Sequence, residues 1–260
     1  MEIVEREDTR VHQEAIRLNR YLALAGVGSR RKNDELILSG AVKVNGKIVR
    51  ELGVKVDPYS DRVSVNGQRV EVQRKVYYIL FNKPKDCITT LSDEKGRTTV
   101  MDYVKIYDRI YPIGRLDRNT TGVLLLTNDG EFANAMMHPK NKIERMYRVR
   151  LESGLPDDDL KKLKRGVRLE DGIAKPQQVG VIPGTKRSEI FISLLEGRNR
   201  EVRRIFEALG HTVKGLDRIS FAGLTIEGVP RGKWRHLSRP EVRYVREQAG
   251  LDNKEYAFSS

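Results

Sequence analysis

Residues 111–130 read YPIGRLDRNTTGVLLLTNDG, and this segment decides most of what the sequence says about the fold. A polar loop lies between Gly114 and Gly122, and an apolar run follows it at 123–127. The turn sequence Asn128-Asp129-Gly130 then ends the run. A short apolar stretch bounded by turn residues is typical of a buried strand. The segment therefore predicts a polar loop that leads directly into a strand of the core.

One carboxylate stands out in this loop. Asp117 lies between Arg115 and Arg118, and flanking cations favour the ionised form of a carboxyl group. An ionised carboxylate suits a nucleophile or a base better than a proton donor. The alternative is that Asp117 only shapes the loop as an Asx turn before Asn119. The residues alone leave both interpretations open.

The segments around this loop predict an α+β unit over residues 76–246. Strand-like apolar runs occur at 76–81, 147–151, 189–195 and 223–226, and helical patterns at about 130–137, 156–164 and 199–209. This mixture favours a mixed or largely antiparallel sheet. We expect a short linker at 71–75 and polar tails at 1–15 and 247–260.

A smaller unit is expected at residues 16–70. Leu18, Tyr21, Leu22 and Ala25 repeat at helical spacing, and Ser29 is a good N-cap for a second helix that stops at Gly40. Asn45-Gly46 and Asn66-Gly67 each lie within alternating valines, which is the strongest short signal for a β-hairpin. The sequence therefore predicts two helices followed by two hairpin turns in one small sheet.

The composition points to a polyanionic partner. The chain has 260 residues and a net charge of +13, and each cation placed at a phosphate releases a counterion. Cys87 is the single cysteine and the four histidines are scattered, so we expect neither a disulfide nor a metal site. No apolar stretch has the length of a signal peptide or a membrane span. We therefore expect a cytoplasmic protein with no membrane partner.

The N-terminal unit resembles a known RNA-binding domain. The stretch RLNRYLALAGVGSRRKNDELILSGAVKVNG resembles the S4 domain through its Gly-x-x-Ser-Arg-Arg step and its Gly-x-Val-x-Val-Asn-Gly hairpin. Lys32-Asn33-Asp34 departs from the usual pattern, and we expect these residues on an exposed face. Basic side chains around the two helices are candidates for phosphate contact rather than a merely solvated surface. They are Arg17, Arg20, Arg30, Arg31 and Lys32.

Three segments of the larger unit resemble the RsuA/RluB family of ribosomal RNA pseudouridine synthases. GRLDRNTTGVLLLTNDG matches the signature loop, ERMYRV the strand with the family's tyrosine, and LLEGRNREVRRIF the third motif. The resemblance implies that Asp117 is catalytic, that Tyr147 stacks on the target base and that Arg203 pairs with the catalytic carboxylate. Glu201 stands where the family commonly has Gln, which puts one local hydrogen bond in doubt.

The resemblance also implies an activity and its partners. It implies isomerisation of a uridine in ribosomal RNA without a cofactor, with 23S RNA favoured by the style of residues 89–97 and 16S RNA as the runner-up. The substrate is naked RNA or a ribosomal precursor particle, and a monomer is expected. Further basic residues near the motifs are candidate RNA contacts, namely Lys83, Lys85, Arg97, Arg115, Arg118, Arg200 and Arg204.

Two other functions stay open at this point. The first is a non-catalytic S4-type RNA-binding or ribosome-assembly protein, which the S4-like unit and the charge support equally well. The second is an RNA glycosylase that releases its base. A glycosylase normally needs a second carboxylate, and no motif of the sequence supplies one.

Overall fold

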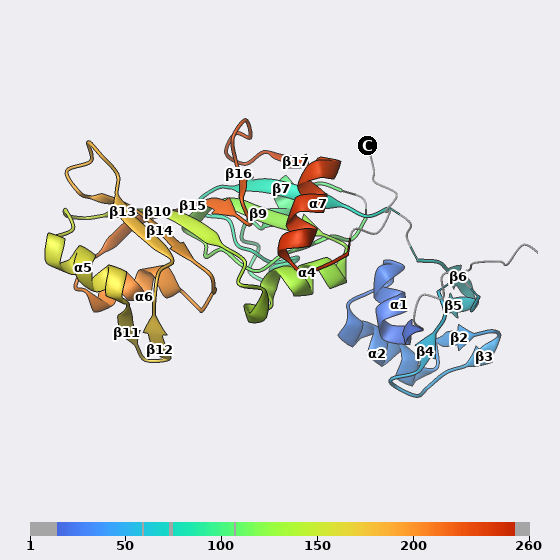
Figure 1. Cartoon of the computed structure of the whole chain (residues 1–260). Coiled ribbons are helices and arrows are strands. Elements are labelled where there is room, and N and C mark those ends of the chain that lie inside the picture. The colour runs from blue at the N-terminus through green and yellow to red at the C-terminus, as the bar shows by residue number, and fades with distance from the viewer. Residues whose placement is uncertain (1–14, 59, 73–74, 107, 253–260) are drawn as a thin grey trace, which may run out of the picture. The chain divides into compact units, whose positions relative to one another are not determined.

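The computed structural model describes residues 15–58, 60–72, 75–106 and 108–252. The chain divides into two compact units, 1–74 and 75–260. Most of the expected N-terminal tail and part of the expected linker lie outside the described residues. Figure 1 shows the elements of each unit.

The N-terminal unit has the two helices and two hairpins expected from the sequence. Helices α1 (Leu18–Leu24) and α2 (Arg30–Ser39) are followed by a sheet of order β3-β2-β5-β6. Its strands are β2 (Val42–Val44), β3 (Lys47–Ile48), β5 (Val63–Val65) and β6 (Gln68–Val70), and a separate pair joins β1 (Ile16–Arg17) to β4 (Lys55–Val56). Asn45 and Asn66 both have φ of 50°, as the predicted turns require.

The start of α2 confirms one prediction and corrects another. The Ser29 side chain accepts a hydrogen bond from the Lys32 amide, and the helix ends at Gly40 with φ of 80°. Asn33, however, is not on an exposed face. It is fully buried, and its Nδ2 donates to the carbonyl oxygens of Asn19 and Gly28. Its amide therefore joins α2 to α1 and to the turn between them.

The larger unit is built on a sheet of nine strands, and the sheet is mixed and largely antiparallel, as predicted. The main path runs β13-β14-β10-β15-β9-β7-β17, with β16 beside β15 and β8 beside β9. In that order the strands are Gln178–Val181, Glu189–Leu194, Arg145–Leu151, Val213–Phe221, Thr120–Thr127, Tyr78–Lys83 and Trp234–His236, then Leu224–Thr225 and Tyr111–Pro112. The β15–β9 pair is parallel and the other pairs are antiparallel.

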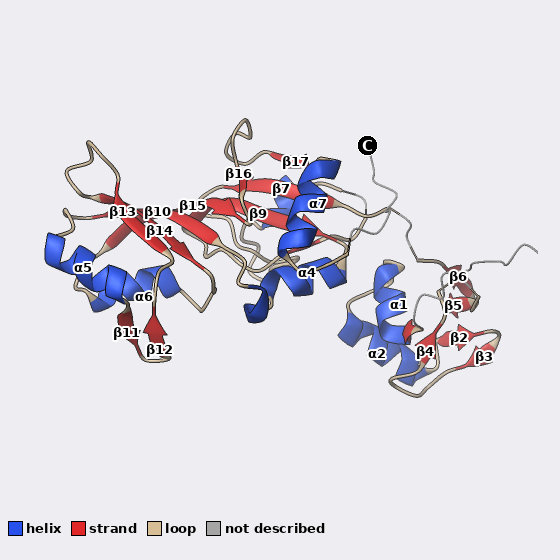
Figure 2. Ribbon diagram, viewed as in Figure 1, coloured by secondary structure: helices blue, strands red, loops and turns tan. Residues whose placement is uncertain are grey.

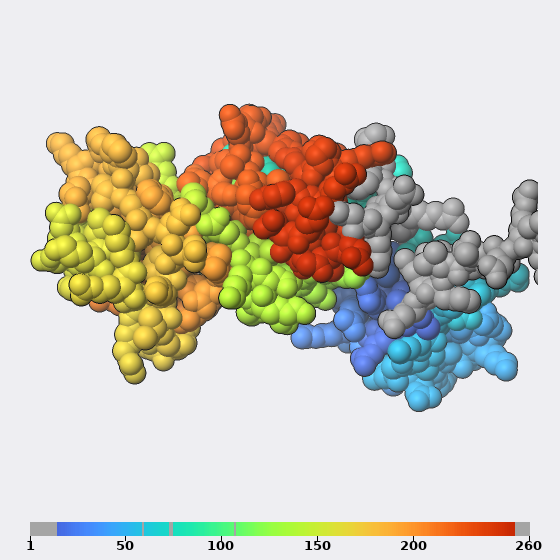
Figure 3. Space-filling view, in the orientation of Figure 1, coloured from blue at the N-terminus to red at the C-terminus, as the bar shows by residue number. Residues whose placement is uncertain are grey.

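Five α-helices and a small hairpin complete the described part of this unit. The helices are α3 (Val100–Tyr103), α4 (Gly130–Met137), α5 (Asp157–Arg165), α6 (Glu201–Ala208) and α7 (Arg239–Gln248), with a 3-10 turn η1 (Pro139–Asn141). The hairpin of β11 (Val167–Leu169) and β12 (Gly172–Ala174) protrudes from the surface of the unit (Figures 1 and 3). Among the described residues no helix has the length and apolarity to cross a membrane.

Helix α7 was not predicted from the sequence, and the boundary expected at residue 246 falls inside it. Ser238 and Glu241 form a capping box at its start. That spacing is visible in the sequence and could have identified the helix. The chain stays ordered beyond it, because Ala249 is buried and the Arg246 guanidinium donates to the carbonyl of Asp252. The first part of the tail expected at 247–260 is therefore packed on the unit, and residues 253–260 lie outside the described residues.

The central strands separate two apolar layers. Ile79, Phe81, Leu124 and Leu126 pack on one face with residues of α3. Leu80, Val123 and Leu125 pack on the other face with α4 and α7, which lie together on that side (Figure 2). Since side chains alternate along a strand, residues in the row of Ile79 and Phe81 lie on the α3 face. Lys83 continues that row at the end of β7.

Candidate active site

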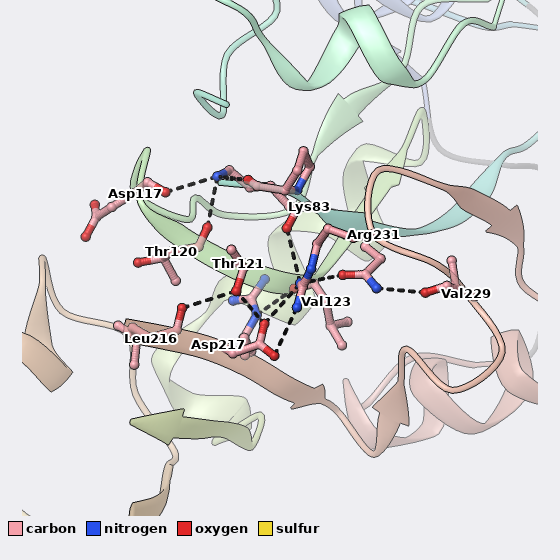
Figure 4. Close-up of polar contacts among 12 residues, drawn as sticks. Lys83, Asp117, Thr120, Thr121, Val123, Leu216, Asp217, Val229 and Arg231 are labelled. Atoms are coloured by element: carbon pink, nitrogen blue, oxygen red, sulfur yellow. Dashed lines mark hydrogen bonds and ion pairs between the residues drawn. The ribbon is translucent and has the colours of Figure 1, made fainter. Parts of the chain in front are cut away.

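Lys83 holds the polar loop that the sequence analysis singled out. Its side chain is fully buried, and its Nζ donates to four carbonyl oxygens, those of Pro84 at 3.1 Å, Asp117 at 3.1 Å, Arg118 at 3.3 Å and Thr120 at 2.9 Å (Figure 4). Burial lowers the pKa of Lys83 to about 8. An ammonium group enclosed in this way is not available to RNA. The expected RNA contact at Lys83 is therefore wrong, and the residue instead anchors the loop.

The backbone of the loop is fixed, whereas the Asp117 carboxylate is left unengaged. The Thr89 hydroxyl donates to the carbonyl of Leu116 at 2.8 Å and accepts from its amide at 3.2 Å. Asp117 is half-buried, and its carboxylate points away from Lys83 (Figure 4). The carboxylate has no hydrogen bond or ion pair with the part of the chain that the structure describes. Its carboxylate oxygens are thus free to meet a substrate.

The two flanking arginines do not pair with Asp117. Arg118 forms an ion pair with Asp86 at 3.1 Å, and Arg115 is exposed with no ion-pair partner among the described residues. The sequence placed both cations beside the carboxylate along the chain. The loop conformation directs them elsewhere.

The strand that follows the loop makes a close parallel contact with β15. Gly122 lies opposite Arg218 and has φ of 104°. A Cβ atom at this position would lie 2.2 Å from the Arg218 carbonyl oxygen. Glycine is therefore required both by the backbone conformation and by the approach of the neighbouring strand.

One register row crosses four strands and brings the site together. Lys83 of β7 is opposite Gly122 of β9, Gly122 is opposite Arg218 of β15, and Arg218 is opposite Tyr147 of β10. Directly opposed residues of a sheet point to the same face. The half-buried ring of Tyr147 therefore lies on the face that carries the Asp117 loop, and it packs against the apolar layer of Ile79 and Phe81.

Arg218 was not expected from the sequence. It is 3% exposed, its Nε donates to the Val123 carbonyl at 2.7 Å, and its guanidinium lies 4.5 Å from the centre of the Phe221 ring. No motif singled it out, because its place beside Tyr147 depends on a strand pairing between residues 71 positions apart in the sequence.

Arg203 is not brought to the Asp117 carboxylate in this structure. It lies on α6, is half-buried, and its Nη1 donates to the Val213 carbonyl at 3.2 Å. It has no ion pair with Asp117 among the contacts of the described residues. Its contact instead joins α6 to the start of β15, the strand that carries Arg218.

On the opposite face of the β9–β15 pair, an ion pair connects β15, β9 and the end of β7. Asp217 of β15 accepts from the Thr121 hydroxyl at 2.6 Å and pairs with Arg231 at 3.1 Å (Figure 4). Arg231 also donates to Asn82 Oδ1 at 2.6 Å and to the Lys83 carbonyl at 3.3 Å. The end of β7 is thus held from both faces, by Arg231 on one side and by the Lys83 side chain on the other.

A charged cluster surrounds the start of α6. Glu201 is buried, and its Oε2 accepts from the Arg198 amide at 3.0 Å, so a glutamate makes a local hydrogen bond at the position where Gln is common. Burial, followed by the neighbouring Glu196, raises the pKa of Glu201 to about 7, while the Arg198 amide and guanidinium act in the opposite direction. Arg198 and Arg204 both bind Asp171 at the tip of the β11–β12 hairpin.

The basic residues expected to contact RNA fall into two groups. Arg17, Arg20, Arg30, Arg31 and Lys32 of the N-terminal unit are all exposed, and no described residue forms an ion pair with them. Lys85 and Arg115 of the larger unit share this property. The remaining four are paired: Arg97 with Asp93, Arg118 with Asp86, Arg200 with Glu207 and Arg204 with Asp171. Within the described ranges no three potential metal ligands converge.

Two protein-family models match this chain. Residues 77–208 match the family model for RNA pseudouridylate synthase, and residues 16–58 match that for the S4 domain. The chain belongs to the RNA pseudouridylate synthase family, whose members are isomerases, and it carries an N-terminal S4 domain. The family resemblance of the three motifs is thereby confirmed.

Several relatives match over nearly the whole chain. One is the ribosomal large subunit pseudouridine synthase B of Bacillus subtilis (strain 168), which is 48% identical over 93% of this chain and 99% of its own length. An uncharacterized RNA pseudouridine synthase of Aquifex aeolicus (strain VF5) is 44% identical over 91% of this chain and 96% of its own. A crystal structure of a pseudouridylate synthase superposes with a TM-score of 0.64 at 26% identity, covering 89% of this chain and all of the other.

Proposed function

We propose that this enzyme isomerises a uridine of 23S ribosomal RNA to pseudouridine, with Asp117 as the catalytic carboxylate. The observation that carries the proposal is the register row from Lys83 to Tyr147, with the Asp117 loop anchored at its first member. It sets an unengaged carboxylate and an aromatic ring on one face of the sheet. The name of the relative from Bacillus subtilis, which specifies the large subunit, favours 23S over 16S RNA.

The chemistry needs the target base outside its stack. Breaking the N-glycosidic bond and joining C1′ to C5 of the same uracil requires access to both the sugar and the base edge. Flipping a base costs a few kcal/mol, and stacking on an aromatic ring returns ~1–3 kcal/mol. Tyr147 supplies that ring, and Asp117 acts on the exposed nucleotide. Because the base is rejoined rather than released, the site must keep it beside the sugar throughout.

The exposed basic residues of the S4 domain serve the same reaction by binding RNA. Phosphate contacts set affinity and register without reading sequence. Arg17, Arg20, Arg30, Arg31 and Lys32 suit that role, because none is engaged by an acid of the described chain. We propose further RNA contacts on the larger unit. They are made by the unpaired Lys85 and Arg115, and by the guanidinium groups of the four paired arginines, Arg97, Arg118, Arg200 and Arg204. The protein acts as a monomer on naked RNA or on a ribosomal precursor particle.

The test is to treat unmodified 23S and 16S RNA separately with the wild-type enzyme and with Asp117→Ala and Asp117→Asn. Pseudouridine is mapped by carbodiimide modification and primer extension, and released uracil is measured in parallel. We expect one new stop in 23S RNA with the wild type, no stop with either variant, and RNA binding within about twofold of the wild type. Substantial turnover by either variant removes Asp117 from the catalytic role. Free uracil would indicate a glycosylase, and a stop in 16S RNA alone would change the substrate.

A further inference from the structure

Arg218 has a hydrogen-bond donor that the folded chain does not use. The side chain is 3% exposed, and its Nη2 is buried with no hydrogen-bond partner in the described structure. An unsatisfied buried N–H, especially on a charged group, reduces stability and is rare in folded proteins. A functional role is one reason for a protein to retain such a group.

Arg145, a neighbouring buried arginine, shows that burial by itself does not leave a guanidinium N–H without an acceptor. Arg145 is also buried and lies 5.2 Å from the centre of the same Phe221 ring. Its Nη1 donates to the Ile143 carbonyl at 2.6 Å and its Nη2 to the Met136 carbonyl at 3.4 Å. Both arginines thus lie against one ring, but the Nη2 of Arg145 has a partner in the described structure and that of Arg218 has none.

The polar side chain next to that donor is Tyr147. The two residues are opposed in the register of β10 and β15, at a point where the register shifts between Met146 and Tyr147. Opposed side chains have Cβ atoms about 4.5–5.5 Å apart. Burial lowers the pKa of Arg218, and the nearby Tyr147 hydroxyl opposes that shift. The register thus places the Tyr147 side chain opposite the guanidinium that carries the unused donor.

We propose that Arg218 is a positioning residue for Tyr147, whose hydroxyl accepts the free Nη2 N–H when the ring stacks on the flipped base. This inference rests on the proposed function, in which Tyr147 is the stacking residue. A phenylalanine at 147 could still stack on the base, but it has no hydroxyl to accept a hydrogen bond from Arg218. Arg218 would then act through Tyr147 and not through the RNA.

A double-mutant cycle on the single-turnover rate tests this dependence. The variants are Arg218→Lys, Tyr147→Phe and the double variant, assayed on 23S RNA together with KM and melting temperature. Loss of one charge-assisted hydrogen bond in the transition state lowers the rate by about tenfold. We expect each single variant to show roughly that loss, the double variant to lose no more than one single variant, and KM to stay within about twofold.

Arg145→Lys, alone and combined with Tyr147→Phe, is the matched control. Its Nη1 and Nη2 already donate to carbonyls, and lysine keeps the positive charge near Tyr147, so its rate effect should multiply with that of Tyr147→Phe. If the effects of Arg218→Lys and Tyr147→Phe also multiply, or if Arg218→Lys retains the full rate, the inference is overturned. A wild-type enzyme that makes no pseudouridine would instead overturn the proposed function.

A second measurement does not depend on the folding of any Arg218 variant. The guanidinium nitrogen signals of Arg218 are followed by NMR in wild type and in Tyr147→Phe, with and without an RNA fragment that carries the target uridine. We expect the RNA to shift the Nη signal in wild type and not in Tyr147→Phe. The same shift in both proteins would overturn the inference, because the hydroxyl would then not be the acceptor.

Discussion

The two units of this enzyme use charged residues in opposite ways. In the N-terminal unit the candidate phosphate contacts are exposed and have no ion-pair partner among the described residues. In the larger unit four of the six remaining candidates are engaged by carboxylates of the same chain. Lys83 and Arg218 are enclosed altogether. The candidate cations of the N-terminal unit are therefore available to bind phosphate. Many cations of the larger unit instead stabilise its fold.

Lys83→Met gives the largest expected effect among the cations of the larger unit. The substitution leaves the carbonyl groups of Asp117, Arg118 and Thr120 without their shared donor. A displacement of about 1 Å in a reacting group can reduce the rate by about 10²-fold. We expect kcat to fall by roughly that factor, with a lower melting temperature and little change in RNA affinity. Single-turnover assays, thermal melting and filter binding measure the three quantities.

Lys85→Met is the control for this prediction. Lys85 is exposed two residues away and has no ion-pair partner in the described part of the chain. Its loss should leave kcat and the melting temperature unchanged and should raise KM at most about threefold, as expected for one surface phosphate contact. If the two lysine variants behave alike, the contrast between enclosed and exposed cations in this unit does not hold.

The same contrast explains how far the sequence could predict the structure. Ser29, Asn45-Gly46 and Asn66-Gly67 act through neighbours a few residues away, so their helix and hairpins were predictable. Asn33 and Lys83 were expected at the surface because both side chains are polar. The sequence does not reveal the distant backbone carbonyls that accept their hydrogen bonds in the folded protein. Lys83 meets partners 34 to 37 positions away.

The active site shows the same limit. The motif resemblance supplied Asp117 and Tyr147, but it could not show that Arg218 stands beside Tyr147. That placement follows from the antiparallel β10–β15 pair and from its register shift, which skips Ile219 of β15, and the sequence pattern specifies neither. Arg203 was chosen by its place in a motif, and the folded chain turns it toward Val213.

A triple variant of the S4 domain tests the opposite side of the comparison. The variant combines Arg30→Gln, Arg31→Gln and Lys32→Gln and so removes three exposed cations at the start of α2. The Ser29 side chain accepts from the backbone amide of residue 32, so the helix cap is retained. We expect weaker RNA binding, with the slope of log affinity against log salt reduced by about 0.7–0.9 per lost phosphate contact. The rate at saturating RNA and the melting temperature should not change.

Lys43→Gln with Lys47→Gln is the matched control, since it removes exposed cations from the β2–β3 hairpin of the same unit. An equal loss of affinity in this control would show that the unit binds through overall charge and not through its helices. A fall in the saturated rate of the triple variant would mean that the S4 domain contributes to the chemical step as well as to binding.

The smallest expected effect concerns the buried acid at the start of α6. Burial raises the pKa of Glu201 to about 7, so the folded state retains a proton that the unfolded chain has released above about pH 4.5. The stability that this proton contributes is present below pH 4.5 and is lost as the pH rises through about 7. Glutamine is neutral throughout and keeps an oxygen for the Arg198 amide. Glu201→Gln should therefore raise the melting temperature by roughly 2–4 °C at pH 8 and change it little at pH 4.5.

Glu207→Gln on the same helix separates titration from helix charge. Its side chain is 55% exposed and lies 3.6 Å from Arg200, so this variant removes one acid from α6 without changing a buried group. If Glu201→Gln raised the melting temperature equally at both pH values, the gain would come from packing and not from a proton. If the gain appears only at high pH, the acid at 201 costs stability near neutral pH, whereas the exposed charges of the S4 domain carry no such cost of burial.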